Sequence, residues 1–383
     1  MKRTIVVCLI AGGALASAAS AQSSVTLYGA IDAGLQWNEQ GVNVGSSSAP
    51  RYQQEDAWAI NSGYTGGSRF GLRGSEPLGG SLSALFILEG GFDVDTGQSG
   101  QSGRLFGRQA WAGLRDSGLG VFALGRIATP SSTTGAFNLW SVDPFEGNWG
   151  LAGIQNTFIA SNSIRWDNSI IWASPTWAGF KVAAHYTFNN DGQETAPQGT
   201  NTSAYSIGGS WNWSVLYLGA TYDVYQFADA GGSRAGAGNS DEKLLQLGAV
   251  LDFKVVKLHA AWAMQDNIGT VQTANFPGWP VSVAPYDNDA WMLGVTVPLF
   301  GGNIRASYQY ADADNISTAT YQFEPDYSVW GLGFDYPFSR RTNVYIGYAQ
   351  RAWDGSYRAT PAPADPANRV DRSQFALGMR HQF

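Results

Sequence analysis

The sequence predicts an all-β protein, a 16-stranded antiparallel transmembrane β-barrel whose third loop folds into the lumen. Three observations predict the barrel: apolar residues recur at every second position, short turns alternate with long polar loops, and only 14% of the 383 residues are charged. A soluble domain carries nearer a quarter charged residues, whereas a helical membrane protein needs runs of about 18 apolar residues. Neither class fits a chain whose mean hydropathy is -0.17.

The first 21 residues have the pattern of a cleaved secretory signal peptide. Lys2 and Arg3 precede an apolar stretch over residues 5–15, and Ala19-Ser20-Ala21 provides a small-residue cleavage site. We therefore expect an exported barrel domain over residues 22–383. The one cysteine, Cys8, lies within the signal, so the exported part forms no disulfide. It keeps 21 basic and 30 acidic residues, an acidic balance that excludes nucleic acid as an expected partner.

Each predicted strand alternates between an apolar and a small or polar face. In 205–213, for example, Tyr205, Ile207 and Trp211 alternate with Ser206, Gly208 and Ser210. Strands of this length match the thickness of the apolar part of a membrane when they are tilted. The sixteen expected strands are 25–36, 64–74, 81–92, 106–115, 119–127, 161–173, 178–188, 204–213, 215–227, 243–253, 255–266, 288–299, 302–312, 327–337, 341–351 and 371–383.

The apolar face is expected to meet lipid and the polar face to line water. A closed sheet satisfies every backbone group and leaves no edge, so its outer band can be wholly apolar. Aromatic residues are expected at the two membrane interfaces, namely Trp166, Trp172, Tyr186, Trp211, Trp213, Trp330, Tyr336 and Phe338. The alternative is a soluble exported β-sandwich or lectin in which these rings fill a core.

Several motifs resemble those of the general diffusion porins of Gram-negative bacteria, particularly the beta-proteobacterial branch. They are Ser24–Gly29, Ser68–Gly74, Gly107–Leu114, Leu124–Arg126 and Arg380–Phe383. The resemblance runs from the signal to the last residue. It implies a homotrimer in the cell outer membrane, in contact with lipid and lipopolysaccharide. It also implies that the terminal Phe383 helps the barrel-assembly machinery to recognise the chain.

The connection from Ile127 to Ala160 is long and rich in bulky residues, which argues for packing against a wall. It is bracketed by Pro130 and Pro144, and its acids are Asp143 and Glu146. Its aromatic residues include Phe137, Trp140, Phe145 and Trp149. Trp140 and Trp149 are expected to narrow the opening or to favour flat apolar solutes.

In the resembling family, carboxylates of this loop face a ladder of arginines on the wall. Carried over by local motif, the resemblance implies a pore constriction formed by Arg69, Arg108, Arg126, Arg165, Asp143, Glu146 and Glu89. Alternation directs Arg69, Arg108 and Arg165 into the lumen. Arg126 shares its parity with Leu124, and Glu89 shares its parity with Ile87, so alternation leaves the direction of these two side chains open.

The predicted function is passive diffusion of ions and small hydrophilic solutes, with selection by size and charge at this constriction. Most acids lie in the long loops, whereas the arginines lie on lumen parity, which predicts mild anion preference and small anionic or neutral solutes. The alternatives are a substrate-specific channel, for organic or aromatic acids, and an outer-membrane hydrolase. No motif selects a catalytic triad, and His185, His259 and His381 are isolated, so neither an enzyme nor a metal or other cofactor is expected.

Overall fold

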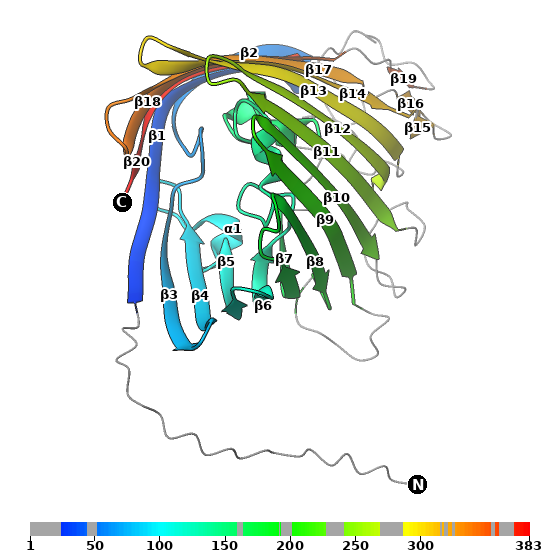
Figure 1. Cartoon of the computed structure of the whole chain (residues 1–383). Coiled ribbons are helices and arrows are strands. Elements are labelled where there is room, and N and C mark those ends of the chain that lie inside the picture. The colour runs from blue at the N-terminus through cyan, green and yellow to red at the C-terminus, as the bar shows by residue number, and fades with distance from the viewer. Residues whose placement is uncertain are drawn as a thin grey trace.

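The computed structural model describes residues 24–43, 52–158, 164–190, 192, 201–226, 241–268, 286–314, 316–317, 321–323, 326–353, 357–359 and 371–383. They form a closed antiparallel barrel with one long connection lodged inside it (Figure 1). The expected signal peptide, residues 1–21, lies outside the described residues. Among the described helices, none is long and apolar enough to cross a membrane.

The wall consists of consecutive antiparallel strands, and the last strand pairs with the first. The strands are β1 (Ser24–Asn43), β2 (Tyr52–Ser62), β3 (Arg69–Gly79), β4 (Leu82–Gly91), β5 (Gln109–Asp116), β6 (Gly120–Ala128), β7 (Arg165–Ala173), β8 (Phe180–Thr187), β9 (Ser203–Trp213), β10 (Leu216–Gln226), β11 (Glu242–Asp252), β12 (Lys257–Ile268), β13 (Tyr286–Leu299), β14 (Gly302–Ala313), β17 (Tyr327–Pro337), β18 (Thr342–Trp353) and β20 (Arg372–Gln382). Pairing of Ala30 with Gln382 closes the barrel.

The second wall strand is interrupted. β1 pairs with β3 near its start, where Ala30 is opposite Arg69, and with β2 farther along, where Ala33 is opposite Ser62. β2 and β3 are therefore two halves of one barrel strand, separated by residues 63–68, and the wall has the sixteen strands that the sequence predicts. The expected boundary of this strand, 64–74, was wrong because its first five residues belong to the interruption.

Smaller elements lie in the connections. Gly100–Gly103 forms the one-turn segment α1, and Leu139–Val142, Gly150–Ala152 and Ile154–Asn156 form the short 3₁₀ helices η1, η2 and η3. A separate three-stranded sheet joins β15 (Ile316–Ser317), β16 (Tyr321–Phe323) and β19 (Tyr357–Ala359), with β16 in the middle. Alternation did not indicate these short strands.

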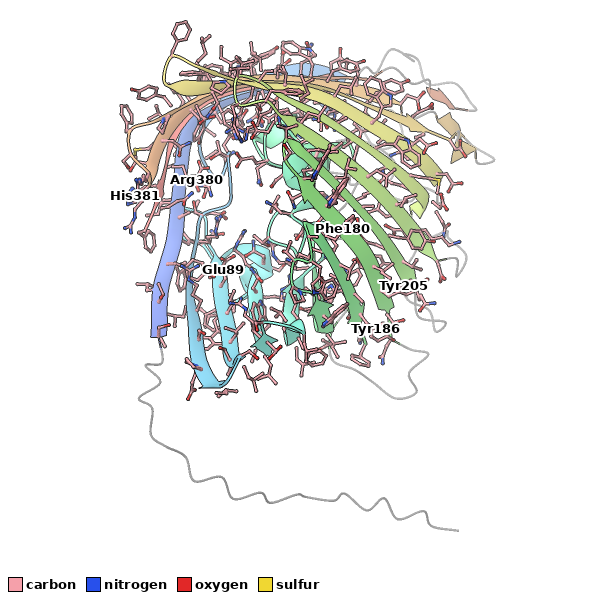
Figure 2. All side chains as sticks on the ribbon, viewed as in Figure 1. Glu89, Phe180, Tyr186, Tyr205, Arg380 and His381 are labelled. Carbon is pink, nitrogen blue, oxygen red and sulfur yellow. The ribbon has the colours of Figure 1, made fainter. Side chains whose placement is uncertain are left out.

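The two faces of the wall differ as predicted. Large apolar side chains such as Leu293 and Leu332 are more than half exposed on the outside, where a membrane covers them. Figure 2 shows the alternation at one place: Arg380 points into the barrel and its neighbour His381 points away from it. Trp166 is an exception to the predicted outer aromatics. It is fully buried, stacks on His185 and donates a hydrogen bond to Tyr225.

Candidate functional site: a loop docked inside the barrel

The connection between β6 and β7, residues 129–164, is here called loop 3, and its described residues 129–158 lie against a part of the inner wall that lacks bulky side chains. Glycines on several strands provide the space. A Cβ at Gly219 or Gly248 would lie 2.7 or 2.9 Å from Leu139 Cδ1, and one at Gly331 would lie 2.7 Å from Ala152 Cβ. At these positions even alanine would press on the loop, so glycine permits its close approach.

The aromatic residues of loop 3 fill this space. Phe145 and Trp149 pack on each other, with ring centroids 5.4 Å apart, and both are nearly inaccessible to solvent. A Cβ at Gly333 would meet both rings. Burying each such side chain stabilises the docked loop by about 1.5–3 kcal/mol. Phe137 and Trp140 are buried as well, so these four rings hold the loop, and Trp140 also belongs to the lining of a cavity on the lumen side of loop 3.

This burial bears on the expectation that Trp140 and Trp149 narrow the opening or favour flat apolar solutes, because rings packed against the wall offer little surface to a solute. The Trp140 ring is 2% exposed and its Nε1 donates a hydrogen bond of 2.8 Å to Gln246 of β11. An indole needs a partner for its N–H when it is buried, and the wall amide supplies it. The aromatic residues of loop 3, which suggested selectivity for flat solutes, are therefore explained by the docking of the loop on the wall.

Polar side chains of the wall bind the loop backbone. Gln309 of β14 donates to Ala152 O at 2.6 Å and accepts from Thr157 Oγ1 at 2.6 Å. The Gln374 side chain accepts from Leu151 N at 2.7 Å, and the Tyr327 hydroxyl donates to Asn156 O at 2.6 Å. Buried amides of the loop thus have partners, without which each would cost about 1–3 kcal/mol.

The interruption between β2 and β3, residues 63–68, is a second support for loop 3. Tyr64 accepts a hydrogen bond from Gly150 N through its backbone oxygen and stacks on Tyr345 with centroids 5.5 Å apart. Asp32, which is fully buried, holds the interruption in place. It accepts hydrogen bonds from Thr65 N, Thr65 Oγ1 and Gly66 N at 2.9, 2.5 and 3.0 Å, and from the Tyr345 hydroxyl at 2.6 Å.

Asp143 lies inside loop 3 and not on its lumen surface, contrary to the expectation that it faces the arginines. Its carboxylate is fully buried and accepts hydrogen bonds from Phe145 N at 3.1 Å and Ile154 N at 2.9 Å. Burial raises the pKa of Asp143 to about 7, against the opposing effect of these hydrogen bonds. Asp143 thus joins two turns of loop 3, and Glu146 remains as the exposed acid of the loop.

The opposite wall is charged. A cavity of about 320 Å³ separates loop 3 from it, and four arginines line the wall side: Arg69, Arg108, Arg165 and Arg380. Thr133, Asn138, Ser141, Glu146, Asn148 and Gln155 line the loop side. The cavity therefore brings three of the four predicted arginines together with Glu146, and it contains more positive than negative side chains.

Glu89 also points to the lumen side, next to these arginines (Figure 2). It accepts a hydrogen bond of 2.6 Å from Arg108 Nε and one of 2.9 Å from the Tyr28 hydroxyl, and Arg69 Nε is 3.8 Å away. Glu89 is 4% exposed, and its buried carboxylate holds Arg69 and Arg108 in position. The Nε atoms of Arg165 and Arg380 have no hydrogen-bond partner among the described residues.

Arg126 lies beside this cavity and not in its lining. It forms an ion pair of 2.6 Å with Asp167 and donates to Gly107 O at 2.8 Å. A register shift between Gly125 and Ile127 explains why alternation gave no direction for Arg126. The shift breaks the period of two, so that Leu124 is 54% exposed outside while Arg126 is half-buried.

Glu146, on the lumen surface of loop 3, forms an ion pair with an arginine of the wall. Arg305 of β14 contacts its carboxylate at 3.2 Å, contacts Asp335 at 2.6 Å and donates a hydrogen bond to Pro144 O. Arg305 thus belongs to the docking side of the wall and positions the acid. The two carboxylates that it contacts neutralise its charge.

Sequence reasoning did not select several residues of this site, among them Asp32, Arg380 and the wall amides Gln309 and Gln374. Alternation placed Arg380 on the lumen face, but only its membership of the terminal motif drew attention to it. Asp32 lacked any signal, because the interruption it binds was expected to be strand. At the end of the chain, Phe383 exchanges two backbone hydrogen bonds of 3.1 Å with Gly29, which ties the terminus to β1.

Within the described residues, no group of three or more His, Cys, Asp or Glu side chains is arranged to hold a metal ion. The arrangement is a closed barrel with an apolar exterior, a charged inner wall and a loop inside it. These features define a transmembrane β-barrel channel.

Comparison with known proteins shows to which family of channels the chain belongs. The model of the Gram-negative porin family matches residues 6–356. An outer membrane porin protein of Bordetella pertussis is 31% identical over 412 residues, and outer membrane porin protein 32 of Delftia acidovorans is 29% identical over 398, both with full coverage of each chain. The chain belongs to the Gram-negative porin family.

Solved structures agree on the fold. An anion-selective porin from Comamonas acidovorans aligns with a TM-score of 0.69 and 23% identity, covering 94% of this chain and 100% of that one. The predictions of family, 16-stranded barrel, outer-membrane location and function as a diffusion channel are confirmed. The roles of individual residues in the constriction remain predictions.

Proposed function

We propose that this channel selects solutes by size and charge where loop 3 faces the wall arginines, and that it prefers small anions mildly over cations. One observation carries the proposal: four guanidinium groups and one carboxylate line the same cavity of about 320 Å³. Arginine stays charged at any relevant pH, and fixed charges act most strongly where the passage is narrowest. The relative from Comamonas acidovorans, described as anion-selective, is consistent with it.

The reversal potential of the purified protein in a planar bilayer tests the proposal. In a potassium chloride gradient we expect the sign of anion preference, and we expect the double variant Arg165→Gln, Arg380→Gln to lose most of it. Arg115→Gln, near the end of β5, is the matched control because this arginine does not line the cavity. Cation preference of the unaltered protein would refute the proposal.

A homotrimer is the proposed assembly, exported with cleavage after Ala21, and recognised through Phe383. A solved relative, OmpT of Vibrio cholerae, is described in a trimer form, with 16% identity and a TM-score of 0.60. Outer-membrane lipid, lipopolysaccharide and the barrel-assembly machinery are its proposed partners. Heat-modifiable migration on gels tests the oligomer, N-terminal sequencing tests the cleavage, and Phe383→Ala is expected to reduce the amount of assembled barrel.

No catalytic activity is proposed. The strongest candidate for a hydrolytic site is a row on β8, β9 and β10, in which His185, Ser206 and Asp223 lie directly opposite one another. The order places serine in the middle, whereas a triad needs histidine there. Neither ring nitrogen of His185 has a hydrogen-bond partner in the described part of the chain. A substrate-specific channel for organic acids stays the second candidate, and saturable block of the current by its ligand would favour it.

A further inference from the structure

The interruption between β2 and β3, residues 63–68, contacts the cavity arginines as well as loop 3. Toward loop 3, Tyr64 O accepts a hydrogen bond of 3.1 Å from Gly150 N. Toward the arginines, Gly66 and Gly67 belong to the lining of the cavity. The interruption thus joins the two parts of the site, the docked loop and the charged wall.

The backbone of the interruption lies against three of the four cavity arginines. Arg69 Nη1 donates a hydrogen bond of 2.9 Å to Gly67 O. A Cβ at Gly67 would lie 3.2 Å from Arg108 Nη1, and one at Gly66 would lie 3.2 Å from Arg380 Nη1. Neither glycine has a left-handed φ, so close approach of the arginines accounts for the missing side chains. The guanidinium groups of Arg108 and Arg380 therefore lie directly against the main chain.

Asp32 of β1 binds the interruption along its whole length. Its backbone oxygen accepts a hydrogen bond of 2.9 Å from Gly63 N, and its backbone N donates one of 3.1 Å to Ser68 Oγ. Between these two positions, its carboxylate accepts the hydrogen bonds from Thr65 and Gly66. Asp32 is fully buried and does not belong to the lining of the cavity. It therefore contacts the interruption and not the solute.

The position of a guanidinium decides what it contributes to selectivity, because the energy between two charges falls with the distance that separates them. Glu89 holds Arg69 and Arg108 from a second side, with their Nε atoms 3.8 and 2.6 Å from its carboxylate. The Nε of Arg380, which points into the barrel in Figure 2, has no hydrogen-bond partner among the described residues. Like charges around one cavity also repel one another. Arg380 therefore depends most on the interruption for its place.

We propose that Asp32 positions the cavity arginines through the interruption and thereby determines anion preference without touching the solute. The inference rests on the anion preference proposed above. The charge of Asp32 has the opposite effect on selectivity. Removing a negative charge near the cavity favours anions, whereas releasing the arginines from the cavity disfavours them. The sign of the change therefore separates positioning from charge.

Reversal potentials of two Asp32 variants in a potassium chloride gradient test the proposal. Asp32→Ala releases the interruption, and we expect it to lower the ratio of anion to cation permeability by at least about twofold for each arginine whose distance from the ion doubles. Asp32→Asn keeps an oxygen for Thr65 and Gly66 and presents an N–H to the Tyr345 hydroxyl, so it should restore most of the preference. A rise in anion preference in both variants would overturn the proposal, because charge alone would then explain the effect.

Thr65→Val tests the same connection without changing any charge. It removes the hydroxyl that donates to Asp32 at 2.5 Å, and we expect it to lower anion preference less than Asp32→Ala does. Thr221→Val on β10 is the matched control, because Thr221 is also buried but its hydroxyl has no hydrogen-bond partner in the described part of the chain. Equal reversal potentials of the Thr65 and Thr221 variants would contradict the proposal.

Two further measurements keep the outcomes distinct. Heat-modifiable migration shows which variants are folded, and Thr65→Val decides the matter if Asp32→Ala is not. Single-channel current noise reports release of loop 3, so a selectivity that changes only together with the noise would overturn the positioning role. Cation preference of the unaltered protein would instead refute the proposed function, which separates that failure from the failure of the inference.

Discussion

The two sides of the lumen wall are built on different principles. From β10 to β18 the inner surface has glycines and amide side chains, and it binds loop 3 through Trp140, Phe145 and Trp149. On β3, β7 and β20, and directly before β5, it has arginines, and the cavity separates them from the loop. The comparison shows how one chain both holds loop 3 in place and keeps charged side chains available in the lumen. Glycines make room for the loop and neutral side chains bind it, so the arginines of the cavity are not needed for docking.

Removing the central ring of the docking side should have the largest effect. Trp149 packs on Tyr64, Phe145 and Tyr345, with centroids 6.0, 5.4 and 5.7 Å away. We expect Trp149→Ala to cost about 3–5 kcal/mol of docking stability, and to give larger and noisier single-channel currents. Trp330→Ala, which removes an outward ring of β17, is the control. Equal current noise in the two variants would contradict the role of Trp149.

Filling the docking surface should act in the same direction but less strongly. At Gly331 a Cβ would lie 2.7 Å from Ala152 Cβ and 3.0 Å from Phe145. We expect Gly331→Leu to destabilise the docked loop by about 1–3 kcal/mol through overpacking. Limited proteolysis should then cleave loop 3 in the intact barrel. Gly209→Ala on the outer face, where the nearest atom is 3.4 Å away, should leave the loop protected.

How far the sequence predicts this arrangement depends on the regularity of each segment. The period of two predicts the barrel and the lumen parity of Arg69 and Arg108, because the pleat alone sets side-chain direction. It fails at Arg126 and in residues 63–68, where a register shift and an interruption break the period. It also cannot distinguish Asp143 from Glu146, since only the packing of loop 3 decides which acid is buried.

Changes on the charged side should alter selectivity and leave the loop in place. A unit charge about 4 Å from an ion contributes about 1 kcal/mol in a water-like medium. Since about 1.4 kcal/mol is tenfold, Arg165→Gln should lower the permeability to anions by about fivefold and raise the permeability to cations, so the ratio of the two falls by more than about fivefold. Arg126→Gln should change it less, because Arg126 is paired with Asp167 beside the cavity. A larger effect of Arg126→Gln than of Arg165→Gln would show that the charge that sets selectivity lies outside the cavity.

A further expected effect is a pH dependence of loop docking. The pKa of Asp143 is raised to about 7 in the folded protein, above its ordinary value of 3.8. The docked loop therefore binds the proton more tightly than the released loop does. Its docking stability should be greatest below about pH 4, fall as the pH rises toward 7, and stay level above it. Current noise should follow this course, and Asp143→Asn should remove the dependence.

The central claim, that loop 3 is docked on the barrel wall in the working channel, can be tested by linking Thr157→Cys of loop 3 to Gln309→Cys of β14 with a short reagent that bridges two thiols through reducible bonds. The part of the chain after the expected signal peptide has no other cysteine, and the side chains of Thr157 and Gln309 are in contact, with Thr157 Oγ1 2.6 Å from Gln309 Oε1. Mass spectrometry of the folded, treated barrel should identify the linked peptides, and single-channel conductance should be unchanged when the link is formed and when it is reduced. Absence of the link, or a conductance that falls when it forms, would contradict the docked loop.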